Sequence, residues 1–375
     1  MRTLDQRLDE LCTQLQFAMM VEHSTIPPYL CALYSIREGS NEEAVSLIQS
    51  VVMEEMLHMV LVANLTNALG GTTCVSQPAF VPRYPNYLPN CSRNFMVHLR
   101  KFSRESVETF MEIEKPDAGD QPVIDNYYWS IGDFYAALRE ELVSLVRDHK
   151  ETAVFRGYHQ NPQFQVTGEH YYGGAGTLFP IRGLFEAQEA ILQIVDQGEG
   201  FSKEKLHDEK FIVRPTSEFE LVPLVPAFSQ ESRFLHKEFD GTVEPAHYFR
   251  FEELYVGRYY QKGDSVTEGP KGPVFPVDWS AVHNMQDNPH AGDYVEGSVV
   301  RQKLDEFNQC YTRLLLKLQR AFSGQPNAIM EGVAEMFEIK HRSQELMRIP
   351  NPLDDGATTV GPSFEFDCTA TAASA

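Results

Sequence analysis

Long hydrophobic runs are missing from this sequence of 375 residues. A membrane-spanning helix needs roughly 18 or more consecutive apolar residues, and no such stretch is present. The chain starts with MRTLDQRLDE, which is polar where a signal peptide would be apolar. We therefore expect a soluble, cytoplasmic protein that has no membrane partner.

Basic residues are scarce as well. Lys and Arg together number 32, against 53 Asp and Glu, which gives a formal net charge of −21. Such a charge repels nucleic acids and anionic membranes, and no basic patch in the sequence offsets it. Nucleic acid is therefore excluded as an expected partner, and we expect a small-molecule substrate instead. The sequence leaves open whether the chain forms homo-oligomers.

The sequence also lacks cysteine motifs, internal repeats and clear strand patterns. The six cysteines include no C-x-x-C spacing, which disfavours a zinc site or a disulfide framework in a chain of this size. No sequence block repeats, and the alternating pattern of β-strands is weak throughout. The sequence therefore favours an all-α fold, with enough residues for a sizeable core.

Apolar residues recur at steps of three and four along much of the chain, which is the pattern of amphipathic helices. One such helix covers 3–22, and Pro27 and Pro28 should bend or restart it because they lack backbone donors. The next helix begins after Asn41 and ends at Gly70. Further helices are predicted over 104–113, 131–148, 181–195, 244–254, 299–321 and 327–348.

Four of these helices carry an acidic residue on the apolar face, and two of them add a histidine one turn later. One Glu from each of two helices and a Glu-x-x-His from each of two others form the ligand set of a dimetal site in a helical bundle. A single Glu-x-x-His is more often a surface pair, but the full set in this order favours metal. The predicted ligands are Glu22, Glu55, His58, Glu199, Glu244 and His247.

Iron is the expected metal. Four carboxylates and two neutral imidazoles offset most of the charge of two divalent irons, and hard oxygen donors suit iron in its higher oxidation state too. The predicted cofactor is therefore a pair of iron ions, with O₂ as co-substrate; a manganese–iron pair is left open.

Several stretches resemble a known family. EHSTIPPYLCALYSI, EEMLHM, NALGG, PRYP, QGEG, HYFRFEEL, EFNQCYTRLLLKLQRAF and GPSFEF are similar to the ferritin-like family that includes the iminophenyl-pyruvate dimer synthases. The similarity runs from about residue 5 to 366. It implies a ferritin-like four-helix bundle with additional helices and long ordered loops, and a role in secondary metabolism. We expect the bundle over 1–260 and a helical extension packed on it over 261–375, as one structural unit.

One predicted ligand departs from the pattern. Pro245 follows Glu244 directly, and proline belongs in the first turn of a helix, so Glu244 would sit at or beside the helix start. Glu252 is the alternative carboxylate of that helix.

The predicted activity is that of a diiron oxidase or oxygenase acting on a small, amino-acid-derived metabolite. Tyr29, Tyr248 and Arg250 flank the ligand segments and are the candidate catalytic residues. Arg250 could hold a substrate carboxylate through paired hydrogen bonds, and a structural ion pair is the equally weighted alternative. An oxidative imine-coupling enzyme and a ferritin-type iron-binding protein are the alternative functions.

Overall fold

The computed structural model describes residues 2–89, 91, 93, 95–116, 128–170, 176–198, 245–261, 264 and 268–372. Helix accounts for 59% of the structure, which confirms the all-α prediction. The longer helices are α1 (Leu4–Ser35), α2 (Glu42–Leu69), α3 (Arg104–Ile113), α4 (Ile131–Asp148), α7 (Leu184–Gly198), α8 (His247–Val256), α9 (Val299–Phe322) and α10 (Ala328–Leu346). The short helices are α5 (Glu151–Val154), α6 (Arg156–Gln160) and α11 (Cys368–Ala372), with 3₁₀ turns at Pro78–Phe80, Pro162–Phe164 and Ala291–Asp293.

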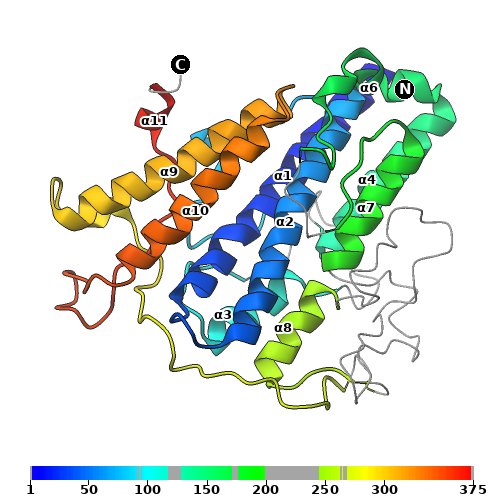
Figure 1. Ribbon diagram of the computed structural model, residues 1–375. Coiled ribbons are helices and arrows are strands. Elements are labelled where there is room, and N and C mark those ends of the chain that lie inside the picture. Colours follow the sequence, from blue (N-terminus) through cyan, green and yellow to red (C-terminus); the bar gives the residue numbers. More distant parts are fainter. Residues whose placement is uncertain are drawn as a thin grey trace.

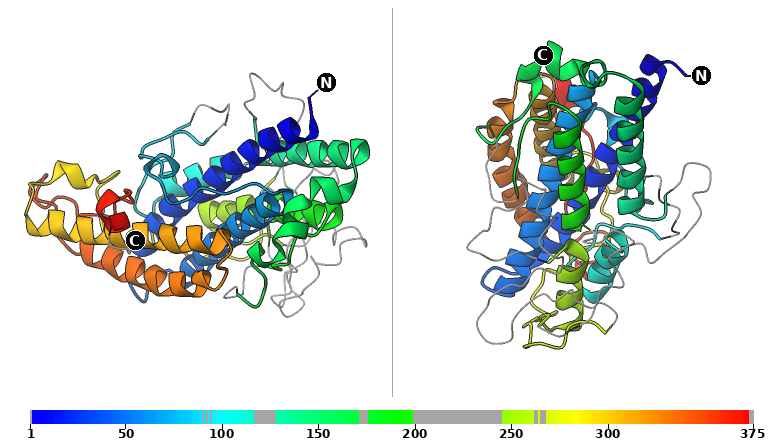
Figure 2. Two further views of the ribbon diagram at one scale, coloured as in Figure 1. Left: turned by 90° about the horizontal axis from the view of Figure 1, so that it is seen from above. Right: turned by 90° about the vertical axis from the view of Figure 1, so that its right-hand side faces the viewer.

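Four helices form a bundle at the centre of the molecule (Figure 1). α1 packs along α2, α4 packs along α7, and the two pairs meet through contacts of α1 with α4 and of α2 with α7. α3 and α8 pack on each other, and they contact α1 and α2 at one end of the bundle. The α9–α10 hairpin lies against the other side of the α1–α2 pair (Figure 2). The α1–α2 pair is therefore the central layer of the fold.

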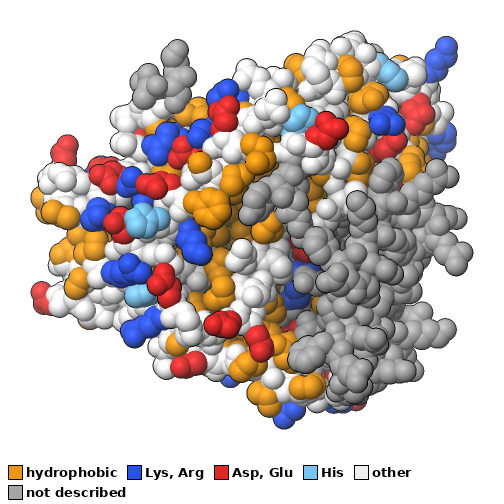
Figure 3. All heavy atoms as spheres, in the orientation of Figure 1, with side chains coloured by type: hydrophobic (Ala, Val, Ile, Leu, Met, Phe, Trp, Pro, Cys, Tyr) orange, Lys and Arg blue, Asp and Glu red, His pale blue; other side chains and the backbone are white. Residues whose placement is uncertain are grey.

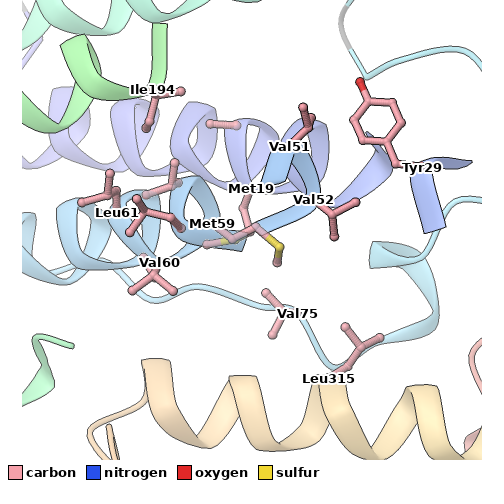
Figure 4. Close-up of a cluster of buried hydrophobic side chains, with 14 of the residues drawn as sticks. Met19, Tyr29, Val51, Val52, Met59, Val60, Leu61, Val75, Ile194 and Leu315 are labelled. Carbon is pink, nitrogen blue, oxygen red and sulfur yellow. The ribbon is translucent and has the colours of Figure 1, made fainter. Parts of the chain in front are cut away.

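A single hydrophobic core runs from the bundle into the α9–α10 hairpin. Figure 4 shows part of it, where Met19, Met59 and Val60 of the α1–α2 pair lie together with Val75 and with Leu315 of α9. Burying these side chains away from water is the main force that holds the hairpin on the bundle. The boundary at residue 260 between bundle and extension stays a prediction.

α1 passes through Pro27 and Pro28 and continues without a break to Ser35. Of the two predicted outcomes, a bend or a restart, the restart is therefore wrong. The ring nitrogen of Pro28 cannot donate to the carbonyl of Ser24 four residues earlier, but the hydroxyl of Tyr84 donates to that carbonyl at 2.7 Å. A side chain from a neighbouring loop thus satisfies one backbone oxygen that the prolines would leave without a donor.

The predicted bounds of α2 are confirmed, although its first cap differs from the expected one. Gly70 ends the helix in the left-handed conformation, with φ at 89°, which glycine adopts without strain. Asn41 precedes the helix but makes no side-chain cap. Its side chain instead donates to the carbonyl of Asp278 at 2.9 Å and accepts from the Asp278 N–H at 2.7 Å. Asn41 therefore joins α2 to the segment that leads into α9.

Among the described residues, α2 is the one helix whose length and composition would suit a membrane crossing. Its most apolar stretch has a mean hydropathy of 1.5, and 67% of that stretch is buried inside the protein. A helix at the centre of a bundle is apolar on most sides because other helices cover it. The apolar character of α2 therefore fits its place in the core.

An ion-pair cluster links α9 to α10. Arg313 and Lys317 of α9 reach Glu335 of α10, at 3.1 Å and 2.8 Å. Burial favours the neutral form of this carboxyl, but hydrogen bonds from Arg313, Lys317 and Cys310 outweigh it and lower the pKa of Glu335 to about 2. The cluster therefore favours the folded hairpin whenever Glu335 is ionised.

We expect Glu335→Gln to lower the free energy of unfolding by about 1 to 2 kcal/mol at pH 7, because it removes charged hydrogen bonds that are partly exposed. The pKa of Glu335 is lower in the folded chain than in the unfolded one. Its stabilisation is thus complete above pH 4.5 and is lost as the pH falls towards 2. Urea unfolding of both proteins at several pH values tests this; a difference that grows in acid would contradict it.

Candidate metal centre

Five buried side chains from four segments meet between the α1–α2 pair, α3 and α8. Glu22 of α1 lies beside Glu55 and His58 of α2, and Glu55 also lies beside Glu114 and His247. Within each of the two groups of three, one ligand atom per residue lies within 4.8 Å of the others. Glu55 belongs to both groups, so they form one cluster around a shared carboxylate.

Local structure fixes where each of these side chains lies. Glu55 and His58 are one turn apart in the middle of α2, where backbone hydrogen bonds hold both ends of the segment. Glu114 is the C-cap of α3, and its N–H donates to the carbonyl of Phe110 at 3.0 Å. His247 is the first residue of α8. The cluster therefore rests mainly on regular helices and not on loops.

Both imidazole rings turn Nδ1 towards the carboxylates. Nδ1 of His58 lies 3.2 Å from Glu22 and 3.7 Å from Glu55, and Nδ1 of His247 lies 3.0 Å from Glu55 and 3.5 Å from Glu114. Nδ1 of His247 is buried and has no aligned hydrogen bond among the described residues. The two rings are stacked, with their centroids 5.7 Å apart. Each Nδ1 is therefore placed to bind a cation that the carboxylates share.

The other ring nitrogens have partners outside the cluster. Nε2 of His58 lies 2.9 Å from Oε1 of Gln197 in α7, and Nε2 of His247 lies 2.7 Å from Oε2 of Glu54. A metal-binding histidine commonly donates its second N–H to a carboxylate or an amide oxygen, which fixes the tautomer and the ring orientation. Gln197 and Glu54 would do this here, leaving Nδ1 of each ring free for a metal.

Two tyrosines orient two of the carboxylates. Tyr135 of α4 donates to Oε1 of Glu22, and Tyr29 of α1 donates to Oε1 of Glu114, each at 2.5 Å. Burial raises the pKa of Tyr29 and of Tyr135 well above the ordinary tyrosine value, with the nearby carboxylates adding to the effect, so both hydroxyls stay protonated donors. In both carboxylates Oε1 is occupied, and Oε2 is the oxygen that faces a histidine.

Glu54 and Arg250 form a buried ion pair behind His247. Nη2 of Arg250 lies 2.9 Å from Glu54 Oε2, Nη1 donates to Ser50 Oγ at 3.0 Å, and Nε donates to the carbonyl of Pro245. Arg250 is 4% exposed and Glu54 is 7% exposed. Burial opposes ionisation of Glu54, but the charge of Arg250 outweighs it and lowers the pKa of Glu54. Arg250 therefore makes the contacts expected of a structural ion pair, the alternative to its role as a substrate anchor.

Without a metal, protons must compensate the negative charge of the cluster. Burial and the charge of Glu114 raise the pKa of Glu55 to about 7. Burial also disfavours a charged His58, but hydrogen bonds and charges from Glu22 and Glu55 outweigh it and raise the pKa of His58 to about 10. The carboxylates, chiefly Glu114, likewise raise the pKa of His247 well above its ordinary value against the effect of burial. A site that gathers protons in this way is one that a cation would stabilise.

The residues fit a pair of divalent cations. Three buried carboxylates and two imidazoles supply hard oxygen and borderline nitrogen donors, the combination that suits iron or manganese. A cation between Glu22, Glu55 and His58 and a second between Glu55, Glu114 and His247 would each have three protein ligands. Each would therefore keep positions open for a small molecule.

Four of the six ligands predicted from the sequence come together in this cluster: Glu22, Glu55, His58 and His247. Glu199 and Glu244 lie outside the described residues. The alternative carboxylate Glu252 is in neither group; it is half-buried and accepts a hydrogen bond from Tyr260.

Of the candidate catalytic residues, Tyr29 lies next to the cluster through Glu114. Arg250 lies behind the cluster, where it pairs with Glu54. Tyr248 is half-buried and its ring packs against Phe249. Tyr29 therefore contacts a candidate ligand directly. Arg250 contacts Glu54, which in turn contacts the candidate ligand His247.

Sequence reasoning missed Glu114. It follows Val107 by seven residues and Phe110 by four, so it continues the buried stripe of α3, and this spacing was the available signal. The buried apolar side chains of α7 lie on one face of the helix. This face runs through Ala187, Ala190, Ile191 and Ile194, whereas Leu192 and Val195 are half-buried. Gln197, three residues after Ile194, continues this face and meets His58.

Comparison with known proteins identifies the family and the fold of this chain. The model of the Ferritin-like family matches residues 15–256, which is more than half of the chain. The chain belongs to the Ferritin-like family. A crystal structure of a ferritin-like protein from Caulobacter vibrioides has 21% sequence identity and a TM-score of 0.58, over 96% of this chain and 98% of that one. This likeness supports the Ferritin-like fold. No curated protein matches the sequence.

Metal binding to this Ferritin-like chain should release protons, and more of them at lower pH. His58 has a pKa of about 10 and the pKa of His247 is raised well above its ordinary value, so a metal must displace a proton from each ring, whereas Glu55 is protonated only below about pH 7. We expect about two protons released per filled chain at pH 8.5 and about three at pH 6, so affinity rises with pH. Calorimetry of Fe(II) or Co(II) binding in buffers of different ionisation enthalpy measures this number. Proton release that is absent, or that rises with pH, would exclude this cluster as the binding site.

Proposed function

We propose that the protein is a non-haem diiron oxidase or oxygenase that uses O₂ to oxidise a small, amino-acid-derived metabolite. The observation that carries the proposal is the shared position of Glu55, which would place two cations side by side. With iron bound, the pair would supply the reduction of O₂ and the oxidation of the substrate. The membership of the Ferritin-like family supports a helical bundle of the kind that holds such pairs.

The chain's own residues would prepare the site for this chemistry. The hydroxyl protons of Tyr29 and Tyr135 hold one oxygen of Glu114 and one of Glu22, which leaves the second oxygen of each for a metal. Glu54, held by Arg250, would keep the proton of His247 on Nε2. The ligands are thereby oriented before any metal enters, and this lowers the reorganisation that metal binding requires.

The class of substrate rests on the sequence motifs. The stretches EHSTIPPYLCALYSI, QGEG and HYFRFEEL resemble the group that includes the iminophenyl-pyruvate dimer synthases, which favours an amino-acid-derived molecule. A narrower form of the proposal is the oxidative coupling of two imine units through a new carbon–carbon bond. The competing function is iron handling without an organic substrate.

Oxygen consumption by the Fe(II)-loaded protein separates these functions. An oxidase or oxygenase should consume little O₂ alone and much more when imines of aromatic 2-oxo acids are added, and mass spectrometry should find an oxidised or coupled product. An iron-storage protein should instead oxidise many Fe(II) ions per chain, in repeated rounds, with no organic substrate. The variant Glu55→Gln serves as the control, because it should lose the iron-dependent reaction in either case.

A further inference from the structure

A large apolar cavity lies on the side of the α1–α2 pair that faces the α9–α10 hairpin. Its volume is about 670 Å³, within the range of small-molecule sites. Side chains from all four helices form the walls, among them Leu30, Val52, Met56, Leu315, Val333 and Ile339. Figure 3 shows hydrophobic side chains gathered in a hollow between the positions that α10 and α2 occupy in Figure 1. The cavity opens to the surface there.

This cavity is separate from the metal centre. On α2, the wall is built by Val52, Met56 and Met59, whereas Glu55 and His58 face the other way, towards α3, α7 and α8. No metal-binding candidate among the described residues lines the cavity. The α1–α2 pair therefore carries two sites, one on each face.

The walls are adaptable. Met53, Met56 and Met59 of α2 face Met336 of α10 across the cavity region. Methionine side chains are flexible and polarisable, and they adjust to apolar ligands of irregular shape. Such a lining suits a ligand with a flexible chain better than it suits a single rigid ring system.

The charged residues of the cavity wall are two cations and two carboxylates. The wall includes Arg37, Glu38, Glu42 and Lys340. Glu38 lies 3.7 Å from Arg348, and Glu42 stands in the first turn of α2, where the helix N-terminus stabilises a carboxylate.

Lys340 differs from these groups. It is exposed on α10, and no hydrogen bond or ion pair to it is found among the described residues. The residues one turn before and after it are Met336 and Gln344, so no acidic neighbour on its own helix compensates its charge. Lys340 is therefore a cation at the edge of an apolar cavity, free to meet an anion from solution.

We propose that this cavity binds an amphipathic monocarboxylate, with the apolar chain among the methionine and leucine side chains and the carboxylate at Lys340. The volume and the apolar walls of the cavity suit the hydrocarbon chain of such a molecule, and the uncompensated cation Lys340 suits its carboxylate. A ligand seated here would touch the turn of α2 that carries Glu55 and His58 from behind. The site is independent of the proposed oxidation and of the presence of iron.

Calorimetric titration of the metal-free full chain with dodecanoate tests the proposal. We expect one molecule bound per chain, and dodecanol or dodecyltrimethylammonium should bind more weakly. Lys340→Glu should weaken dodecanoate binding by roughly threefold to tenfold at low salt, because attraction becomes repulsion. Lys150→Glu is the matched control: Lys150 is exposed before α5 and is not part of the cavity wall, so its reversal should leave binding unchanged.

A second variant tests the cavity itself. Val333→Trp should fill the space from α10 and abolish dodecanoate binding, while Fe(II) binding on the opposite face stays at the wild-type level. Absence of dodecanoate binding, or equal binding by Lys340→Glu and the wild type, would overturn the proposal. So would a homodimer that Phe337→Glu dissociates, because this exposed side chain on the rim would then mark an interface between two copies.

Discussion

Replacing Glu55 by glutamine should reduce the iron bound after anaerobic loading from about two atoms per chain to well below one. Glu55 is the carboxylate common to both ligand groups, so its loss removes a ligand from each metal at once. A neutral amide has about the same volume but offers no negative charge to the cations. Elemental analysis after gel filtration measures the iron content, and circular dichroism of the metal-free variant checks that the bundle still folds.

Variants that remove a ligand from only one of the two groups are compared with Glu55→Gln. His58→Ala and Glu114→Gln each remove a ligand from one group only, so each should keep about one iron atom. Glu186→Gln is the control, since this half-buried residue of α7 belongs to neither group. If Glu55→Gln retained two iron atoms, or lost no more iron than His58→Ala, Glu55 would not bridge two metals.

Replacing Arg250 by alanine should cost about 3 to 5 kcal/mol in the free energy of unfolding of the metal-free protein. Its guanidinium compensates Glu54, and both groups are buried. Removal of the arginine leaves a carboxylate in the interior with His247 as its remaining charged neighbour. Unfolding in guanidinium chloride, followed by circular dichroism, measures the loss.

A double variant separates charge from packing. Arg250→Met combined with Glu54→Gln removes both charges and keeps most of the volume, so it should be more stable than Arg250→Ala. Arg258→Ala is the matched control, because this exposed arginine near the end of α8 should cost less than about 1 kcal/mol. Unchanged stability in Arg250→Ala, together with weaker substrate binding, would return Arg250 to the role of a substrate anchor.

Local sequence patterns were enough to predict most of the helices. The spacing of apolar residues placed α3, α4, α9 and α10 within two residues of their observed ends. The same spacing placed Glu22 and the pair Glu55 and His58 on buried faces, where the structure has them. These predictions succeeded because each depends on residues within a turn or two of one another, and helical geometry relates such residues directly.

Partners from distant segments could not be predicted in this way. Glu54 and His247 are 193 residues apart in the chain, and they meet only because α8 lies against α2. The path of α1 through Pro27 and Pro28 depends on Tyr84, which lies on a separate loop. Spacing within one helix carries no information about such contacts.

Local patterns in the sequence are sufficient to predict an all-α chain whose helices bury carboxylates and imidazoles, because a charged residue on an apolar stripe must find a partner in the interior. Which residues share the cluster depends on how the helices pack in three dimensions. Helix packing places Glu114, at the end of α3, beside Glu55. It also places Gln197 of α7 beside His58. The physical reason is that a metal centre consists of side chains that meet across the interfaces between packed helices. Those interfaces depend on contacts between distant parts of the chain.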